Sequence, residues 1–374
     1  MKSLKLLWLP ALITPFDQCA AREAEGPRPA DEDDCDCFLI NGSNPTYYAK
    51  HMFFDFRSLA EFAGAPDVLK DPKDAALASP SSDYFDSDDW TSVWELQTWD
   101  NEVGHDDELS EGAPILMVNS PNNVFLERSD EDDDNAPDTF MTLRTKRLPK
   151  FQTAAEFEST NDYLYVSLRV LARTIGAPGA VTAIFTYRDS EELADVQEAD
   201  IEFLTGGSRR IIHYTNQPSY SLEGDNFPEA TRSAAVPGGG DWTEWMVHRL
   251  DWTPDGCVWY VDGVETASIS YQTPRDPSQI IFNAWSNGGY WSGNMSTYDE
   301  AYLQVQWIEM VFNKTGGEDE GSCARVCSID ETDEAGAIAM LWNSPASRLV
   351  LDGWLNGGWF GLWAVTLALS HWAL

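Results

Sequence analysis

The chain has 374 residues, enough for one large domain with appended ends or for two average domains. Its 62 acidic residues outnumber 24 lysines and arginines, and the net charge of −38 repels nucleic acid and anionic membrane surfaces. With 43% hydrophobic residues, including 16 Trp, the chain can build a core and still place aromatic side chains on a binding surface. We therefore expect one folded domain with appended ends, a monomer, and no nucleic-acid partner.

The N-terminal segment has the pattern of a secretory signal. Lys2 and Lys5 precede the apolar stretch 6–13, and Cys19-Ala20-Ala21 supplies the small residues that a signal peptidase requires. We predict that residues 1–21 are removed on export and that residues 22–34 form an acidic, proline-rich lead.

Cysteine usage agrees with export. Five cysteines remain once the signal is removed: Cys35, Cys37, Cys257, Cys323 and Cys327. On an extended chain the Cβ atoms of Cys35 and Cys37 lie ~6.5 Å apart, beyond the ~3.5–4.5 Å that a disulfide needs. Each is expected to pair with Cys323 or Cys327, which ties the start of the domain to its end and leaves Cys257 as a buried thiol. Three glycosylation sequons, beginning at Asn41, Asn294 and Asn313, fit the same compartment.

Between residues 35 and 320 the chain consists of short apolar or alternating runs separated by Gly, Pro, Asn and Asp. Runs of this length, rich in Val, Ile, Thr and aromatic residues, are typical of strands. The predicted strands include 52–56, 140–144, 163–170, 181–187, 199–204, 211–214, 245–251, 258–261, 280–284 and 303–311. Asp262-Gly263 predicts a tight hairpin turn. These patterns favour an all-β domain over 35–320, either a sandwich or a barrel.

Three acidic residues, Glu198, Asp200 and Glu202, alternate with apolar residues. On a strand they share one face, and like charges crowded within ~13 Å can keep one carboxyl protonated as a general acid. Retaining glycosidases need a nucleophile and an acid/base with carboxyls ~5–5.5 Å apart, which two long glutamate side chains can reach by leaning together. A strand with a solvated acidic face is the alternative interpretation.

The segment Glu-Ala-Asp-Ile-Glu-Phe-Leu at 198–204 resembles the signature of glycoside hydrolase family 16, which includes lichenases, laminarinases and cell-wall transglycosylases. The similarity covers roughly residues 140–313 and includes the stretches 151–158, 214–216, 248–254, 259–263 and 283–286. It implies a concanavalin A-like jelly-roll β-sandwich of two antiparallel sheets, with a substrate cleft across the concave sheet. It also implies that Glu198 is the nucleophile, Asp200 its helper and Glu202 the acid/base. The N-terminal part is similar to secreted fungal members.

Sugar rings stack on aromatic side chains, so a glycan cleft needs exposed rings beside polar groups. The candidates for substrate binding are the aromatic residues Trp285, Tyr290 and Trp291 and the hydrogen-bonding residues Tyr214, Asn216 and Gln217. Core packing is the alternative for any single tryptophan.

The C-terminal part changes character after residue 320. Residues 321–352 are predicted to form a stalk, and the apolar, uncharged segment 353–374 is predicted to be a signal for a glycolipid anchor. A retained membrane helix and an ordinary core helix are the alternatives. We expect an extracellular protein at the cell surface or cell wall, with membrane contact only through this anchor.

Together these features predict a retaining, endo-acting hydrolase of cell-wall β-1,3- or mixed β-1,3/1,4-glucan. A glucan transglycosylase using the same residues is the alternative, and a non-catalytic glycan-binding lectin on the same fold is a more distant one. No cofactor and no metal ligands are expected from the sequence. The resemblance implies that a structural calcium ion can be present, but the sequence does not place it.

Overall fold

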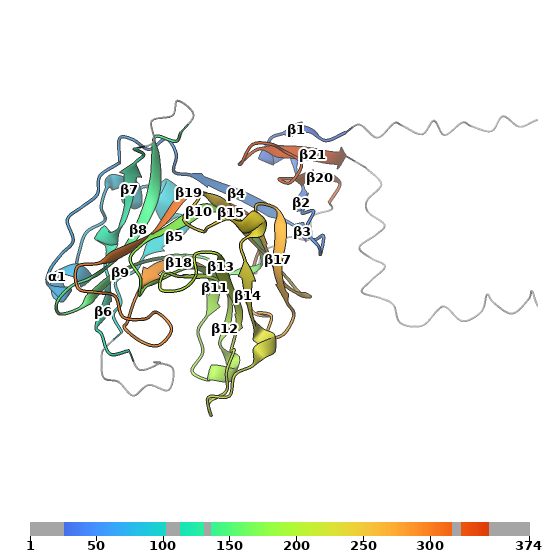
Figure 1. Cartoon of the computed structure of the whole chain (residues 1–374). Coiled ribbons are helices and arrows are strands. Elements are labelled where there is room, and N and C mark those ends of the chain that lie inside the picture. Colours follow the sequence, from blue (N-terminus) through green and yellow to red (C-terminus); the bar gives the residue numbers. More distant parts are fainter. Residues whose placement is uncertain (1–25, 102–112, 131–135, 316–322, 344–374) are drawn as a thin grey trace, which may run out of the picture.

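The computed structural model describes residues 26–101, 113–130, 136–315 and 323–343, whose regular elements are mainly β-strands (Figure 1). The two short α-helices are α1 (Pro72–Ala76) and α2 (Asp88–Thr91). No helix in these ranges is long and apolar enough to cross a membrane. The predicted signal over 1–21 and the tail over 353–374 lie outside the described residues. The predicted all-β class is confirmed.

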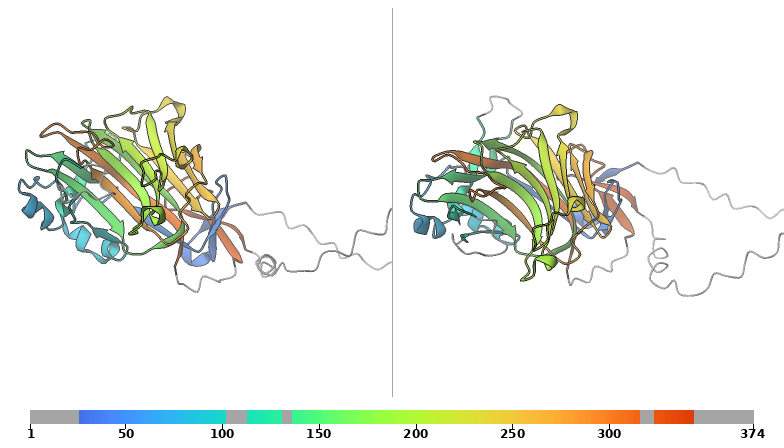
Figure 2. Two further views of the ribbon diagram at one scale, coloured as in Figure 1. Left: turned by 90° about the horizontal axis from the view of Figure 1, so that it is seen from below. Right: turned by 60° about the horizontal axis from the view of Figure 1, so that its bottom comes forward.

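The main sheet is continuous and folds back on itself, so that its strands form two facing layers (Figure 2). The front layer consists, in spatial order, of β14 (Thr231–Ala235), β13 (Ile211–Gln217), β12 (Gln197–Leu204), β11 (Val181–Arg188), β18 (Gln279–Trp285) and β9 (Gln152–Ser159). The back layer consists of β8 (Thr139–Arg147), β19 (Glu300–Lys314), β10 (Tyr163–Gly176), β15 (Met246–Thr253), β16 (Gly256–Val261) and β17 (Val264–Ile269). Four further strands pair with members of these layers: β4 (Lys50–Asp55) with β19, β5 (Trp94–Leu96) and β6 (Met117–Asn119) with β9, and β7 (Val124–Arg128) with β8.

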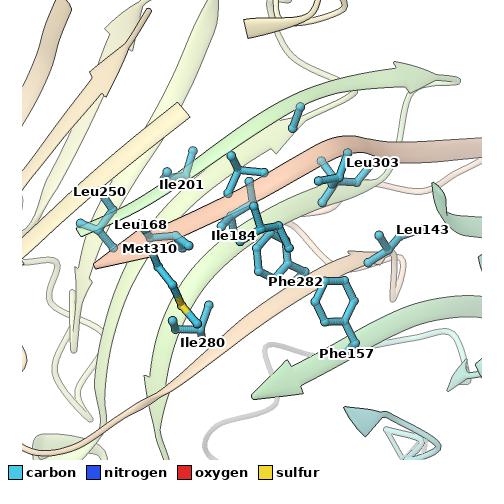
Figure 3. Close-up of a cluster of buried hydrophobic side chains, with 14 of the residues drawn as sticks. Leu143, Phe157, Leu168, Ile184, Ile201, Leu250, Ile280, Phe282, Leu303 and Met310 are labelled. Atoms are coloured by element: carbon cyan, nitrogen blue, oxygen red, sulfur yellow. The ribbon is translucent and has the colours of Figure 1, made fainter. Parts of the chain in front are cut away.

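The core lies between the two layers, because alternate side chains of each strand point inward (Figure 3). Ile201 of the front layer belongs to the same buried cluster as Leu250 and Met310 of the back layer. Within the front layer the rings of Phe157 and Phe282 stack with centroids 4.7 Å apart. Full burial of one such side chain contributes roughly 1.5–3 kcal/mol. This packing fixes which face of each strand remains available for a site.

The hairpin between β16 and β17 forms at the predicted turn. Asp262 and Gly263 both have positive φ, 48° and 75°. A two-residue turn of this kind matches the right-handed twist of its strands, which explains the Asp-Gly pair. The predicted hairpin is confirmed.

A second, smaller sheet lies at the edge of the sandwich (Figure 1). Its strands, in spatial order, are β1 (Arg28–Ala30), β21 (Ile338–Asn343), β20 (Arg325–Ser328), β2 (Cys37–Leu39) and β3 (Tyr47–Tyr48). The described parts of the predicted lead (22–34) and stalk (321–352), residues 26–34 and 323–343, therefore contribute strands to this sheet, which corrects the prediction for those residues. Strands of two to six residues among glycines and acids carry no periodic signal. Ile338 and Met340 are buried in a cluster with Phe38 and Tyr48 of the same sheet and Val311 of β19.

Buried ion pairs attach this small sheet to the back layer. Asp330, just after β20, lies 2.8 Å from Nη2 of Arg169 and 3.2 Å from Nη1 of Arg249. Arg249 also pairs with Asp251 at 2.7 Å. Breaking a buried pair leaves an uncompensated charge, typically at a cost of about 3–5 kcal/mol. The small sheet is thus fixed to the layer that does not carry the three acids.

Two disulfides close the small sheet, Cys35–Cys327 and Cys37–Cys323, and Cys257 is a buried free thiol. The sequence analysis left the pairing between these four cysteines open. The links span 292 and 286 residues, so they close nearly the same loop. Once one link is present, the other constrains only a few additional residues.

We expect removal of the first disulfide, whichever of the two it is, to cost less stability than removal of the second. Replacing one pair by serine should lower the free energy of unfolding by about 2 kcal/mol, and removing the second pair should cost roughly 5 kcal/mol more, because only then does the long loop open in the unfolded chain. Denaturant unfolding of both single-link variants and of the variant without links measures this. Equal, additive losses would contradict the shared-loop account.

His248 of β15 is fully buried between the layers against Phe203, with ring centroids 4.9 Å apart. Burial lowers the pKa of His248 to about 4, whereas an unfolded histidine titrates near ~6.5. The unfolded state therefore binds the proton first, and stability should fall by about 3 kcal/mol as pH drops from about 6.5 to about 4. In His248→Leu this component should be absent, so the difference between the two pH profiles of unfolding free energy isolates it. Parallel profiles would show that His248 does not titrate as described.

Candidate active site

Strand β12 places the three acids on the side of the front layer that faces away from the core. Ala199, Ile201 and Phe203 lie in the core cluster, so Glu198, Asp200 and Glu202 share the opposite face. The pairing of β12 with β11 runs from Gln197 to Leu204 without a register shift. The strand is therefore regular between the two glutamates, as the spacing predicts.

This face of the front layer is hollowed into a cleft of about 1030 Å³. Its carboxylates are Glu156, Glu158, Asp189, Glu198, Asp200 and Glu202. Among the described residues that line it there is no lysine or arginine. A cleft of this charge repels anionic ligands and accepts uncharged ones.

Strand β13 places one of its three predicted substrate-binding residues in the cleft and buries the other two. The residues directly opposite the three acids are Gln217, Thr215 and His213. Gln217 lines the cleft, as predicted. Tyr214 is 1% exposed and accepts a hydrogen bond from Thr266, and Asn216 is fully buried, donating to the Tyr271 carbonyl. The predicted substrate contacts of Tyr214 and Asn216 are wrong, because the period of two places the even-numbered residues of β13 toward the core.

All three predicted aromatic residues, Trp285, Tyr290 and Trp291, line the cleft. Tyr290 is 97% exposed, so its ring is available to a ligand. Trp291 is half-buried, and its Nε1 donates a hydrogen bond of 2.9 Å to Oε1 of Glu202. The three rings therefore share the cleft with the acids but differ in exposure and contacts.

Asp200 is buried between the two glutamates. Burial raises its pKa well above the usual value, and the neighbouring charges of Glu198 and Glu202 raise it further. Burial also raises the pKa of Glu198 to about 7, while a hydrogen bond with Asp200 has the opposite effect. A protonated Asp200 can donate this hydrogen bond and so favour the ionised form of Glu198. The arrangement favours one neutral and one charged carboxyl at adjacent positions.

Glu156 of β9 is a cleft residue that the sequence analysis did not assign. Its Oε1 accepts a hydrogen bond of 2.5 Å from Nε1 of Trp99, and its Oε2 accepts one of 3.2 Å from Nδ2 of Asn283. Burial raises the pKa of Glu156 to about 7. The sequence contains a signal for this position, because Glu156 and Glu158 alternate with the core residue Phe157. The acids of β12 alternate with core residues in the same way.

The remaining predicted sites lie away from the acids. Asn41 and Asn294 are exposed, whereas Asn313 is half-buried and its Oδ1 accepts a hydrogen bond from the Ala49 N–H. In the described ranges no three His, Cys, Asp or Glu residues are grouped as metal ligands would be. The structure thus gives no position for the calcium ion that the resemblance implied.

Comparison with known proteins identifies the family. A model of glycosyl hydrolases family 16 matches residues 122–309. A β-glucanase of Paenibacillus polymyxa is 27% identical over 175 residues, 46% of this chain and 70% of that protein. "Probable glycosidase CRR1" of Saccharomyces cerevisiae is 28% identical over 158 residues, 39% of this chain and 35% of that protein. The laminarinase catalytic domain of Thermotoga maritima aligns with a TM-score of 0.48 and 15% identity, covering 75% of this chain and all of that one. Because the family model spans half of the sequence and contains the acidic strand, this chain belongs to glycosyl hydrolases family 16.

Proposed function

We propose that this protein is a retaining, endo-acting glycosidase on β-1,3- or mixed β-1,3/1,4-glucan. The observation that carries the proposal is the regular strand β12, which presents Glu198 and Glu202 on either side of the buried Asp200 in an open cleft. An open cleft admits the interior of a polysaccharide chain, and a lining without basic side chains suits an uncharged glucan. The β-glucanases among the relatives support this substrate class.

The proposed reaction has two steps. In the first, the Glu198 carboxylate attacks the anomeric carbon while the glycosidic bond breaks and the departing oxygen takes the proton of Glu202. In the second, a water molecule gives a proton to Glu202, and its oxygen attacks the anomeric carbon and displaces Glu198. Two displacements at one carbon leave its configuration unchanged. Asp200 supports the first step by its hydrogen bond to Glu198.

Transglycosylation by the same residues is the second candidate. It differs only in the second step, where a sugar hydroxyl replaces water. The cleft lining also includes Tyr220 and Phe227, whose rings provide aromatic surface on which an acceptor sugar can stack.

Product analysis on a panel of β-glucan oligosaccharides, with and without acceptor sugars, tests both candidates. A hydrolase gives shorter glucans irrespective of acceptor, and a transglycosylase gives products longer than its donor when an acceptor is added. If neither shorter nor longer glucans form from any β-1,3 or β-1,3/1,4 substrate, the proposed substrate class is contradicted.

We further propose that the enzyme is exported, glycosylated and held at the cell surface by a glycolipid that replaces its C-terminal tail. The two disulfides are typical of an oxidising compartment, and Asn41 and Asn294 are accessible to glycosylation. Treating intact cells with a phospholipase that cuts glycolipid anchors should release active enzyme without residues 359–374. Detection of that peptide in the mature protein by mass spectrometry would contradict the anchor.

A further inference from the structure

The acid/base candidate Glu202 lies in a row of polar side chains that crosses three strands. In the ladder between β12 and β13, His213 is directly opposite Glu202, and in the ladder between β13 and β14, Ser233 is directly opposite His213. Directly opposite residues on one face have Cβ atoms ~4.5–5.5 Å apart. The Oγ of Ser233 lies 2.9 Å from Nδ1 of His213 and fixes the orientation of that ring.

Trp291 completes this group from the loop that follows β18. Its indole ring meets the His213 imidazole in a T-shaped contact, with centroids 5.4 Å apart and planes at 73°. The same indole donates from Nε1 to Oε1 of Glu202 at 2.9 Å. Ser233, His213, Trp291 and Glu202 thus form a connected chain of contacts that ends on one carboxylate oxygen.

The chemistry of an indole N–H makes this contact directional. The indole nitrogen donates a hydrogen bond and does not accept one, so Oε1 of Glu202 must be the acceptor in both protonation states. A carbonyl oxygen accepts a hydrogen bond better than a hydroxyl oxygen does, so this contact favours a Glu202 proton on Oε2. The T-shaped contact with His213 restricts rotation of the indole. Burial lowers the pKa of His213, which favours the uncharged form of that ring beside Glu202.

We propose that Trp291, supported by His213, is a positioning residue for the proton of Glu202: it holds Oε1 as acceptor and leaves Oε2 to deliver the proton to the glycosidic oxygen. This inference rests on the proposed role of Glu202. It gives Trp291 a function different from that of a ring on which sugar stacks, and it assigns a role to His213, which lies on the cleft-bearing face of β13.

The test is Trp291→Phe, which keeps an aromatic ring and removes the N–H. Loss of one hydrogen bond to an ionisable group should lower kcat on natural glucan about 10- to 100-fold, with little change in KM. The loss of kcat should be smaller on an aryl glycoside, because its leaving group needs no proton. The basic limb of the pH profile of kcat/KM should move to higher pH, because the lost donor favoured the charged form of Glu202. The titratable groups that share the cleft face with Glu202 are Glu198 and Asp200 on β12, and His213 lies opposite it on β13. Its partner on β11, Ala183, does not titrate. His213→Ala should shift both readouts in the same direction by a smaller amount.

Trp285→Phe is the matched comparison, since Trp285 lines the same cleft from β18, whereas the indole that donates to Glu202 is that of Trp291. We expect it to raise KM equally for both substrates and to leave the pH profile in place. If Trp291→Phe behaves like Trp285→Phe while Glu202→Ala shows strong dependence on the leaving group, the positioning role is wrong and the proposed function stands. If Glu202→Ala itself shows no such dependence, the acid/base assignment fails, and the positioning role fails with it.

Discussion

Glu198→Ala should abolish hydrolysis of every β-glucan, lowering kcat by roughly 10⁴-fold or more, because it removes the group that forms the covalent intermediate. Added azide should then restore turnover. Azide attacks the anomeric carbon from the face that Glu198 has vacated, while Glu202 protonates the departing oxygen. The product is a glycosyl azide with inverted configuration, which proton NMR distinguishes from the retained anomer.

Glu158→Ala is the matched control for this experiment. Glu158 lines the same cleft and is a carboxylate, but it lies on β9 rather than on β12. We expect a much smaller loss of activity, with no azide product. Activity of Glu198→Ala close to that of the unmodified enzyme would rule out Glu198 as the nucleophile.

Glu202→Ala should have a different signature, since it removes the proton donor and leaves the nucleophile. Natural glucan, whose leaving group must be protonated, should lose the most activity, and an aryl glycoside with a good leaving group should lose far less. Azide should act in the second step and give a glycosyl azide of retained configuration. Comparing kcat/KM for the two substrates and the anomer of the azide product measures both effects. A uniform loss on both substrates, or an inverted azide, would contradict the assignment.

The acid-bearing face could be predicted from the sequence because the period of two in β12 is unbroken. Each acid at 198, 200 and 202 is followed by an apolar residue, and the apolar set belongs to the core. The Asp262-Gly263 turn could also be predicted from the sequence, because both residues tolerate positive φ. In these places local chemistry and long-range packing require the same conformation.

The same rule, applied to β13, would have excluded two of the predicted substrate contacts. Tyr214 and Asn216 were selected from a family-like stretch and not from their position in the alternation. Their neighbours Thr215 and Gln217 are the ones that line the cleft. Whether a polar residue on a buried strand can contact substrate depends on which face of the strand carries its side chain.

Other features depend on contacts that no local pattern encodes. The small sheet joins segments about 290 residues apart, and its strands are too short to show a period. The hydrogen bond from Trp291 to Glu202 joins residues 89 positions apart, and Trp291 lies in a loop whose path the sequence does not fix. Trp291 was predicted as a stacking ring because composition indicates an aromatic cleft but not which ring contacts an acid.

Trapping of the covalent intermediate tests the central claim most directly. A 2-deoxy-2-fluoro β-glucosyl oligosaccharide with a good leaving group slows breakdown of the glycosyl-enzyme, so the intermediate should accumulate. After proteolysis, mass spectrometry should find the sugar on the peptide that contains Glu198, with fragment ions placing it on that residue. A label on a different residue, or absence of any label together with an inverted hydrolysis product, would contradict double displacement through Glu198.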